Sequence, residues 1–171
     1  MKRLARITLA AALASVSVAT SADQQGDLLL LLACAPSSVR QQDRAAAEAL
    51  FRSIETKDGD GGSRVAGPIR SGSACVERVE IAAAFGVLMV AGRLCNEDHR
   101  SLVDLLRRAG MPLQSKAGSD PRVIEAYEAF GKYAISFVEG EVSLKAGQSP
   151  RGIGDGNVTS YVCTFRGSGP Q

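Results

Sequence analysis

Four cysteines constrain the fold of this chain more than any other feature, because they can close two disulfides if the chain leaves the reducing cytoplasm. They are Cys34, Cys75, Cys95 and Cys163. The N-terminus indicates that the chain is exported. Lys2, Arg3 and Arg6 precede a short apolar run, and the small residues Thr20-Ser21-Ala22 follow it. This is the pattern of a cleavable signal peptide. We predict a signal peptide at residues 1–22, a mature chain from Asp23, a periplasmic or secreted location and two disulfides.

A second interpretation of the N-terminal region is open. Leu31-Leu32-Ala33-Cys34 fits a lipobox, which would make Cys34 a lipidated N-terminus. Against it, Asp23 and Asp27 interrupt the apolar segment that should precede such a site. Lipidation would also leave an odd number of cysteines in an oxidising compartment. The sequence favours disulfide bonding of Cys34 but leaves lipidation as the alternative.

The charge of the mature chain argues against two classes of partner. Residues 1–22 hold three basic residues and no acidic one, so their removal lowers the net charge from +2 to −1. No basic surplus remains to neutralise phosphates, so we predict neither nucleic-acid binding nor membrane insertion after signal cleavage. The remaining 149 residues suit one domain. Aromatic residues are only 5% of the chain and Trp is absent, so the core must be mainly aliphatic.

The first half of the mature chain predicts helices. Residues 26–35 contain five consecutive leucines, Leu28 to Leu32, and Leu and Ala favour a short helix buried on all sides. Ser37 or Ser38 can cap a second, amphipathic helix that runs to about Lys57. Residues 58–73 contain five glycines and one proline and predict a long loop.

The segment between Cys75 and Cys95 allows two structures. Residues 81–92 are apolar throughout, and three consecutive alanines, residues 82–84, favour a buried central helix. The alternative is a two-stranded hairpin that turns near Ala84 to Gly86 and brings Cys75 and Cys95 together. We predict the helix. An unbroken helix would separate the two cysteines by about 30 Å, whereas bridged Cα atoms lie within about 7 Å. With helices running up and down, the predicted disulfides are Cys34–Cys95 and Cys75–Cys163.

The second half of the chain predicts two more helices and an extended end. After Asn96, a short amphipathic helix presents Leu102, Val103, Leu105 and Leu106, and ends at Gly110. Ser119-Asp120-Pro121 is typical of a helix start, and apolar residues follow at helical spacing to about Gly140. Residues 158–165 have β-character. The sequence thus predicts a mainly α fold: a small disulfide-stapled bundle of about five helices with an extended C-terminal segment. Residues 23–148 would form the helical domain, and residues 149–171 a Gly-rich tail stapled through Cys163.

No motif in the sequence predicts a metal, a cofactor or a catalytic centre. His99 is the only histidine, and Cys95 four residues earlier gives at most half of a metal site. No Gly-x-Ser-x-Gly nucleophile elbow is present. Asp58-Gly59-Asp60-Gly61 resembles the start of a calcium loop, but Gly62 and Ile69 stand where ligands are needed. We therefore predict no catalytic, metal-binding or cofactor-binding residues, and only the four disulfide cysteines as special sites.

These exclusions favour a binding protein over an enzyme. We expect an exported cell-envelope protein that acts on a protein partner, such as an inhibitor, an immunity-type protein or an assembly accessory. The alternative is a small periplasmic enzyme that uses the carboxylates of Glu125, Glu128 and Asp98. Convergence of these carboxylates in one concave pocket would favour the enzyme. An apolar patch beside residues 58–73 would favour the binding protein.

Overall fold

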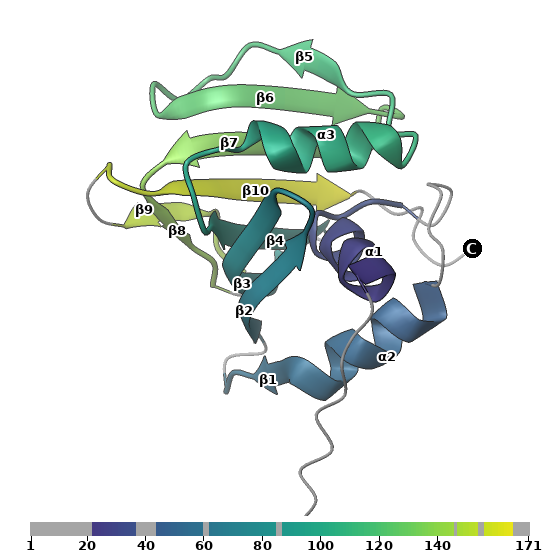
Figure 1. The fold of residues 1–171 in the computed structure, drawn as a ribbon. Helices are drawn as coiled ribbons and strands as arrows, with labels where there is room; N and C mark the ends of the chain where they lie inside the picture. The colour runs from purple at the N-terminus through teal and green to yellow at the C-terminus, as the bar shows by residue number, and fades with distance from the viewer. Residues whose placement is uncertain are drawn as a thin grey trace, which may run out of the picture.

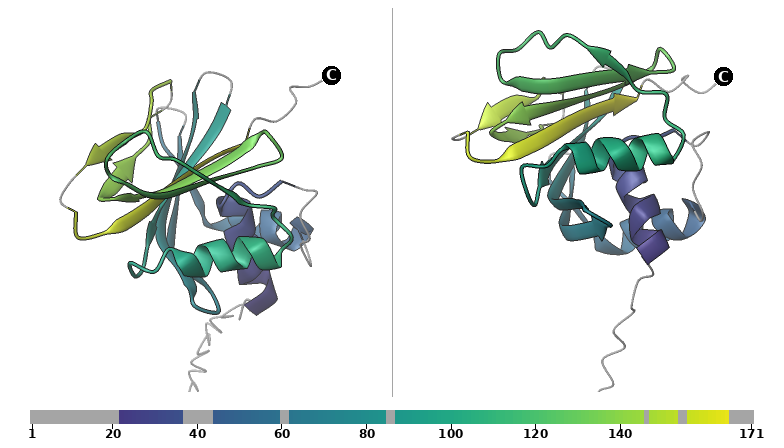
Figure 2. Two further views of the ribbon diagram at one scale, coloured as in Figure 1. Left: turned by 90° about the horizontal axis from the view of Figure 1, so that it is seen from above. Right: turned by 45° about the horizontal axis from the view of Figure 1, so that its top comes forward.

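The described part of the chain folds around a large antiparallel β-sheet, with three short helices on one side of it (Figures 1 and 2). The computed structural model describes residues 22–36, 44–59, 62–84, 87–145, 147–153 and 156–165. The predicted signal peptide lies outside these residues except for Ala22. The predicted helical bundle is wrong, because two of the five segments expected to be helical, residues 75–95 and 121–140, form paired strands of a large sheet.

The helices are α1 (Ala22–Leu32), α2 (Arg44–Ile54) and α3 (Arg100–Arg108). The sheet has eight strands in the order β1-β2-β3-β4-β10-β7-β6-β5. Their bounds are β1 (Glu55–Lys57), β2 (Ser63–Ser71), β3 (Ala74–Ala84), β4 (Val87–Leu94), β5 (Gln114–Lys116), β6 (Val123–Ala129), β7 (Tyr133–Glu139) and β10 (Thr159–Phe165). A separate two-stranded sheet pairs β8 (Glu141–Ser143) with β9 (Arg151–Ile153). The segment expected as a tail thus supplies β9 and β10, and β10 lies between β4 and β7 in the larger sheet.

The leucine-rich segment is a buried helix, as its composition predicts. Leu28, Leu29 and Leu32 of α1 are each 1% exposed. The last carbonyl groups of a helix have no partners within it, and at the end of α1 two buried tyrosines donate hydrogen bonds to such groups. The Tyr133 hydroxyl donates to the Ala33 carbonyl at 2.9 Å, and the Tyr161 hydroxyl donates to the Leu32 carbonyl at 3.1 Å. Strands β7 and β10 therefore hold the C-terminal end of α1 against the sheet.

Cys34 follows α1 and forms a disulfide with Cys163 of β10, with the two Cα atoms 6.0 Å apart. This pairing excludes the lipidated form of Cys34 in the folded protein, because its sulfur is already bonded. It also corrects the predicted Cys34–Cys95 bridge. The second disulfide joins Cys75 to Cys95 at a Cα separation of 5.4 Å, so the predicted Cys75–Cys163 bridge is wrong as well.

The predicted central helix at residues 81–92 is instead the antiparallel hairpin of β3 and β4, in which Ile81 pairs with Val90. The apolar run is continuous because both faces of these strands are covered as far as the Ile81–Val90 pair, whereas Ala83 and Leu88 near the end of the hairpin are exposed. Val90 belongs to the main core beneath the helices, whereas Ala82 and Met89 pack with Leu144 on the opposite face. A strand buried on both faces loses the polar–apolar alternation that distinguishes it from a helix. Burial therefore outweighs the helix propensity of the alanines.

The predicted helix from Pro121 to Gly140 is also wrong, because this segment forms β6 and β7. A turn joins the strands at Phe130 and Gly131, whose φ angles are +56° and +64°. Two consecutive residues with positive φ make the tight turn that suits an antiparallel hairpin. Asp120 does not cap a helix; its side chain accepts a hydrogen bond from the Arg122 main-chain N–H at 2.9 Å.

Three other sequence predictions are confirmed. The helix after Asn96 is α3, and its predicted apolar face is buried. Gly110 has a φ of +93° just beyond α3, as expected for a residue that ends a helix. Residues 159–165 form β10.

The predicted loop at residues 58–73 is largely β2, which pairs with β3. No described helix is long and apolar enough to cross a bilayer.

Candidate functional site

The helices leave part of the sheet uncovered near the paired ends of β3 and β4. Two cross-strand pairs on the helix-facing side form the floor of a cleft here: Ile81 with Val90, and Ala83 with Leu88. The cleft has a volume of about 470 Å³. Leu88 is 52% exposed, the largest exposed fraction among the large apolar side chains of the described residues. The floor is therefore an apolar surface that the described chain leaves open at Ala83 and Leu88, whereas Val90 is buried.

The walls of the cleft come from α1 and α2. Leu31 and Leu32 contribute from the end of α1, and Phe51 contributes from α2. Helix α2 is amphipathic: Ala47 is fully buried, whereas Arg52 is exposed. One face of α2 therefore packs on the core, and its neighbouring face borders the cleft.

Charged residues form the rim, and both rim carboxylates have partners. Glu48 lies 2.7 Å from Arg44, and Glu55 lies 2.6 Å from Lys57. The pKa of Glu55 is lowered, first by the hydrogen bond from Lys57 and then by one from Ser63. Arg52 differs from these residues. Its Nε donates to the Glu48 main-chain carbonyl at 3.3 Å, and it forms no ion pair with a carboxylate of the described residues.

A second polar cluster lies between α3 and β6. The Tyr127 hydroxyl donates to Glu125 Oε2 at 2.5 Å. His99 Nε2 lies 3.2 Å from the same oxygen, although its orientation does not satisfy hydrogen-bond geometry. The His99 ring packs against Phe137, with the ring centres 5.0 Å apart. This cluster places the only histidine of the chain in a buried structural position between a helix and the sheet.

The hydrogen bond from Tyr127 is the main reason that the pKa of Glu125 lies below its ordinary value, and partial burial opposes this shift. The pKa of Tyr127 is raised, chiefly by burial and then by the neighbouring carboxylate. Both shifts keep Glu125 charged and Tyr127 protonated at neutral pH. The pair therefore acts as a fixed donor and acceptor.

The three carboxylates of the enzyme alternative do not converge. Glu125 shares the α3-facing side of β6 with Tyr127, and the alternation of a strand places Glu128 on the opposite side. Glu128 pairs there with Lys116 at 3.0 Å. Asp98 lies at the start of α3 and accepts a hydrogen bond from Ser101 at 2.5 Å. That bond is the first cause of the lowered pKa of Asp98. Each carboxylate thus has its own local partner.

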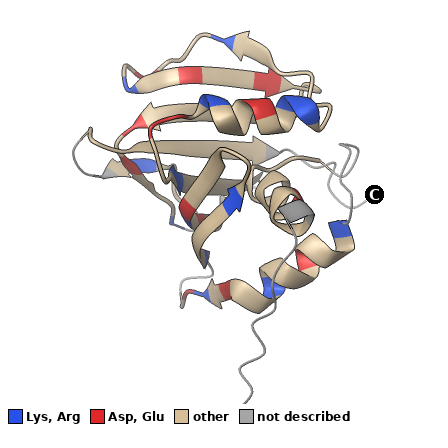
Figure 3. Cartoon of the chain, in the orientation of Figure 1, with Lys and Arg blue, Asp and Glu red and all other residues tan. Residues whose placement is uncertain are grey.

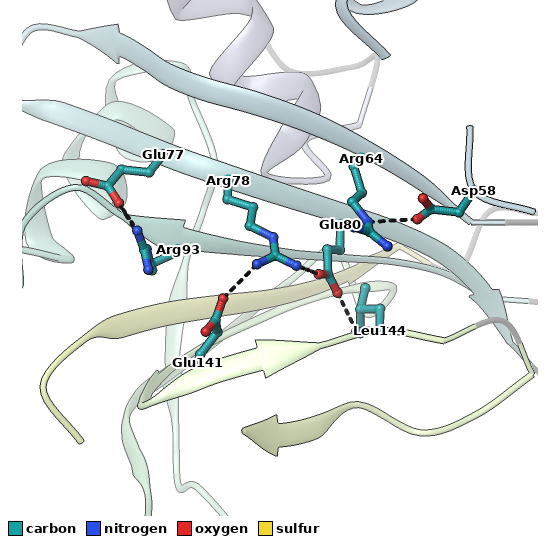
Figure 4. A network of polar contacts seen from close by, with 8 residues as sticks. All are labelled: Asp58, Arg64, Glu77, Arg78, Glu80, Arg93, Glu141 and Leu144. Carbon is teal, nitrogen blue, oxygen red and sulfur yellow. Dashed lines mark hydrogen bonds and ion pairs between the residues drawn. The ribbon is translucent and has the colours of Figure 1, made fainter. Parts of the chain in front are cut away.

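The sheet face opposite the helices carries a network of ion pairs (Figure 4). Arg78 lies between Glu80, at 2.5 Å, and Glu141 of β8, at 3.1 Å. Glu80 also accepts a hydrogen bond from the Leu144 main-chain N–H at 2.8 Å. These contacts attach the segment around β8 to β3, so the network has a structural role. Glu77 and Arg93 form a separate pair beside it.

Acidic and basic residues follow one another along α2 and α3 and do not separate by sign (Figure 3). The described residues contain no group of three or more His, Cys, Asp or Glu side chains that could hold a metal ion. Cys95, the ligand considered together with His99, is held in a disulfide.

The sequence analysis did not find the cleft. Its floor residues lie in the apolar run that we assigned to a buried helix. The hairpin alternative carried the relevant signal, because it places Ala83 and Leu88 on one face of the two strands.

Comparisons of this chain with protein-family models, with curated proteins and with solved structures give no match. The fold and the cleft define a disulfide-bonded, antiparallel β-sheet protein with an apolar cleft open beside α2.

Proposed function

We propose that this chain is an exported binding protein that acts on a protein partner through the cleft beside α2. Inhibitors, immunity-type proteins and assembly accessories all act by binding a protein partner. Two disulfides are compatible with an oxidising compartment outside the cytoplasm. The partner would insert apolar side chains between α2 and the floor formed by β3 and β4.

The observation that carries this proposal is the exposure of Leu88 at the floor of an apolar cleft. Single exposed apolar residues are common on protein surfaces, but an apolar floor with apolar walls is a feature of binding sites. In protein interfaces, a few side chains buried in such pockets supply most of the affinity. Lys57 at the end of β1 and Ser63 at the start of β2 also line the cleft.

The absence of convergence among Glu125, Glu128 and Asp98 favours binding over catalysis. The enzyme alternative required these carboxylates to share one pocket. Glu125 and Glu128 instead lie on opposite faces of β6, and Glu128 pairs with Lys116 of β5. Asp98 is engaged by Ser101 at the start of α3.

Two matched variants test the proposal. Leu88→Glu places a charge in the cleft, whereas Ile124→Glu places the same charge on another exposed apolar position, 40% exposed on β6. The purified mature proteins would be used to capture partners from an envelope extract of the source organism, with quantitative mass spectrometry. We expect wild type and Ile124→Glu to retain the same partner, and Leu88→Glu to lose it at least about tenfold, which corresponds to about 1.4 kcal/mol. Equal capture by all three proteins would contradict the proposal.

A further inference from the structure

We propose that the partner segment in this cleft carries an acidic residue beside its aliphatic side chains, and that Arg52 binds that carboxylate. This inference rests on the proposed function and names the chemistry of the partner. It follows from three features of the described residues: the apolar floor, the charges on the rim and the form of the sheet edges.

The apolar floor determines which side chains of a ligand can bind in the cleft. Leu88 presents an exposed branched aliphatic side chain and Ile81 a half-buried one, the buried Val90 completes the floor, and Phe51 adds an aromatic wall. No charged side chain comes from β3 or β4 into this floor. Burying aliphatic groups here gains roughly 25 cal/mol per Å² of apolar surface, whereas burying a charge would cost much more. The groups that reach the floor are therefore aliphatic side chains.

The charged residues of the rim determine which ligand charge is favoured next to those side chains. The carboxylates of Glu48 and Glu55 are already paired with Arg44 and Lys57. Arg52 alone among the rim cations has no carboxylate partner within the described residues. A guanidinium can bind a carboxylate through two parallel hydrogen bonds. A ligand carboxylate above the cleft would therefore gain a partner, and a ligand cation there would be repelled.

The form of the sheet edges indicates whether a peptide segment can bind by adding a strand to the sheet. Edge strands β1 and β5 are three residues long each. Farther along β2, the Arg70 main-chain N–H donates to the Gln25 side chain of α1 at 3.1 Å. Short and covered edges are poor templates for the addition of another strand. The segment therefore docks through its side chains and lies along α2, where Arg52 can reach it.

Two short peptides with the same apolar body test the inference: acetyl-Glu-Leu-Leu-Glu-amide and acetyl-Lys-Leu-Leu-Lys-amide. Each would be titrated into the mature, disulfide-bonded protein while the methyl NMR signals of Leu88 and Val90 are followed. We expect the acidic peptide to shift these signals with an affinity at least about threefold higher than that of the basic peptide, the size expected of an exposed ion pair. Arg52→Gln should abolish this preference. Arg108→Gln, which removes an exposed arginine of α3, should leave it unchanged.

Three outcomes would overturn the inference. One is equal affinity for both peptides; another is a preference that survives Arg52→Gln. The third is binding of decanoate at the cleft without binding of either peptide, because it would identify the occupant as a free fatty acid. In all three cases, partner capture that still depends on Leu88 would leave the proposed function standing. Capture that does not depend on Leu88 would instead reject the proposed function itself.

Discussion

The helix-facing side of the sheet differs between its middle, over β7 and β10, and the paired ends of β3 and β4. In the middle, Tyr133, Phe137 and Tyr161 are at most 1% exposed beneath the helices. At the ends of β3 and β4, Leu88 is 52% exposed on the same side of the same sheet. Both regions present apolar side chains. The difference lies in what covers them and in how firmly the cover is attached.

The cover over the middle of the sheet is fixed by bonds as well as by packing. The end of α1 is held by the hydroxyls of Tyr133 and Tyr161 and by the Cys34–Cys163 disulfide. Over β3 and β4, α2 borders the floor and leaves a cleft of about 470 Å³. We infer that the first region supplies stability and that the second contributes little to it. Its side chains are therefore available for binding.

The largest expected loss of stability comes from removing a disulfide, and the two disulfides should differ. Cys34–Cys163 spans 129 residues, whereas Cys75–Cys95 spans 20. The chain-entropy model gives about 5 kcal/mol for the longer loop and about 3 kcal/mol for the shorter one. Cys75 and Cys95 are also already joined by a main-chain hydrogen bond of 3.1 Å. Urea unfolding of the variants Cys34→Ser/Cys163→Ser and Cys75→Ser/Cys95→Ser would measure both effects. A greater loss of stability in the second variant would contradict the stabilising role given to the Cys34–Cys163 disulfide.

The next largest loss of stability is expected from truncating a buried side chain, and one truncation in each region makes the comparison. Phe137→Ala removes a fully buried ring that contacts His99 and Tyr127, and should lower the free energy of unfolding by about 3–5 kcal/mol. Leu88→Ala should change it by no more than about 0.5 kcal/mol, since half of this side chain is already in water. Chemical denaturation of the two variants and wild type provides the measurement. Similar losses in both variants would show that the cleft belongs to the stabilising core.

The pH dependence of stability should show a smaller effect from the α3–β6 cluster. The pKa of Glu125 in the folded protein lies below its ordinary value of 4.5, chiefly because Tyr127 donates a hydrogen bond to the charged form. A lowered folded-state pKa adds stability above the ordinary value, and this contribution is lost as the pH falls through the folded-state pKa. Because Glu125 is one-third exposed, we expect less than about 1 kcal/mol.

The measurement for this prediction is the unfolding free energy of wild type and Glu125→Gln between pH 7 and pH 3. Wild type should be the more stable protein at pH 7, and the difference should shrink toward pH 3. Glu128→Gln is the matched control, because its pair with Lys116 is more exposed on the other face of β6. A constant difference across this range would contradict the role given to Tyr127.

The sequence predicted several elements correctly where one signal dominated. The consecutive leucines of α1, the apolar face of α3 and the β-branched character of β10 each favour the structure that was found. Residues 81–92 did not, because an apolar run without alternation has no periodicity that separates a helix from a hairpin, and the alanines favoured the helix. Only the register of β3 and β4 settles which side Leu88 faces. The cleft could therefore not be predicted before that pairing was known.

The prediction for the segment from Val123 to Glu139 failed for a different reason. Its apolar residues fit helical spacing, but Tyr133, Ile135 and Phe137 also alternate as a strand does. The turn between the strands places Phe130 at a φ of +56°, a conformation that aromatic residues rarely adopt. No Asn-Gly or Asp-Gly pair marks it. The disulfide pairing was wrong because it was derived from these two misassigned segments.

Site-specific photo-crosslinking tests the central claim, that the open region is the binding surface. A photoactivatable amino acid would replace Leu88 in one protein and Phe130 in another, since both side chains are about half exposed. The two proteins would be expressed in the source organism and irradiated in intact cells. We predict a discrete cross-linked partner from position 88 and none from position 130. Cross-links from position 130 alone, or the same products from both positions, would contradict the assignment of the cleft as the binding site.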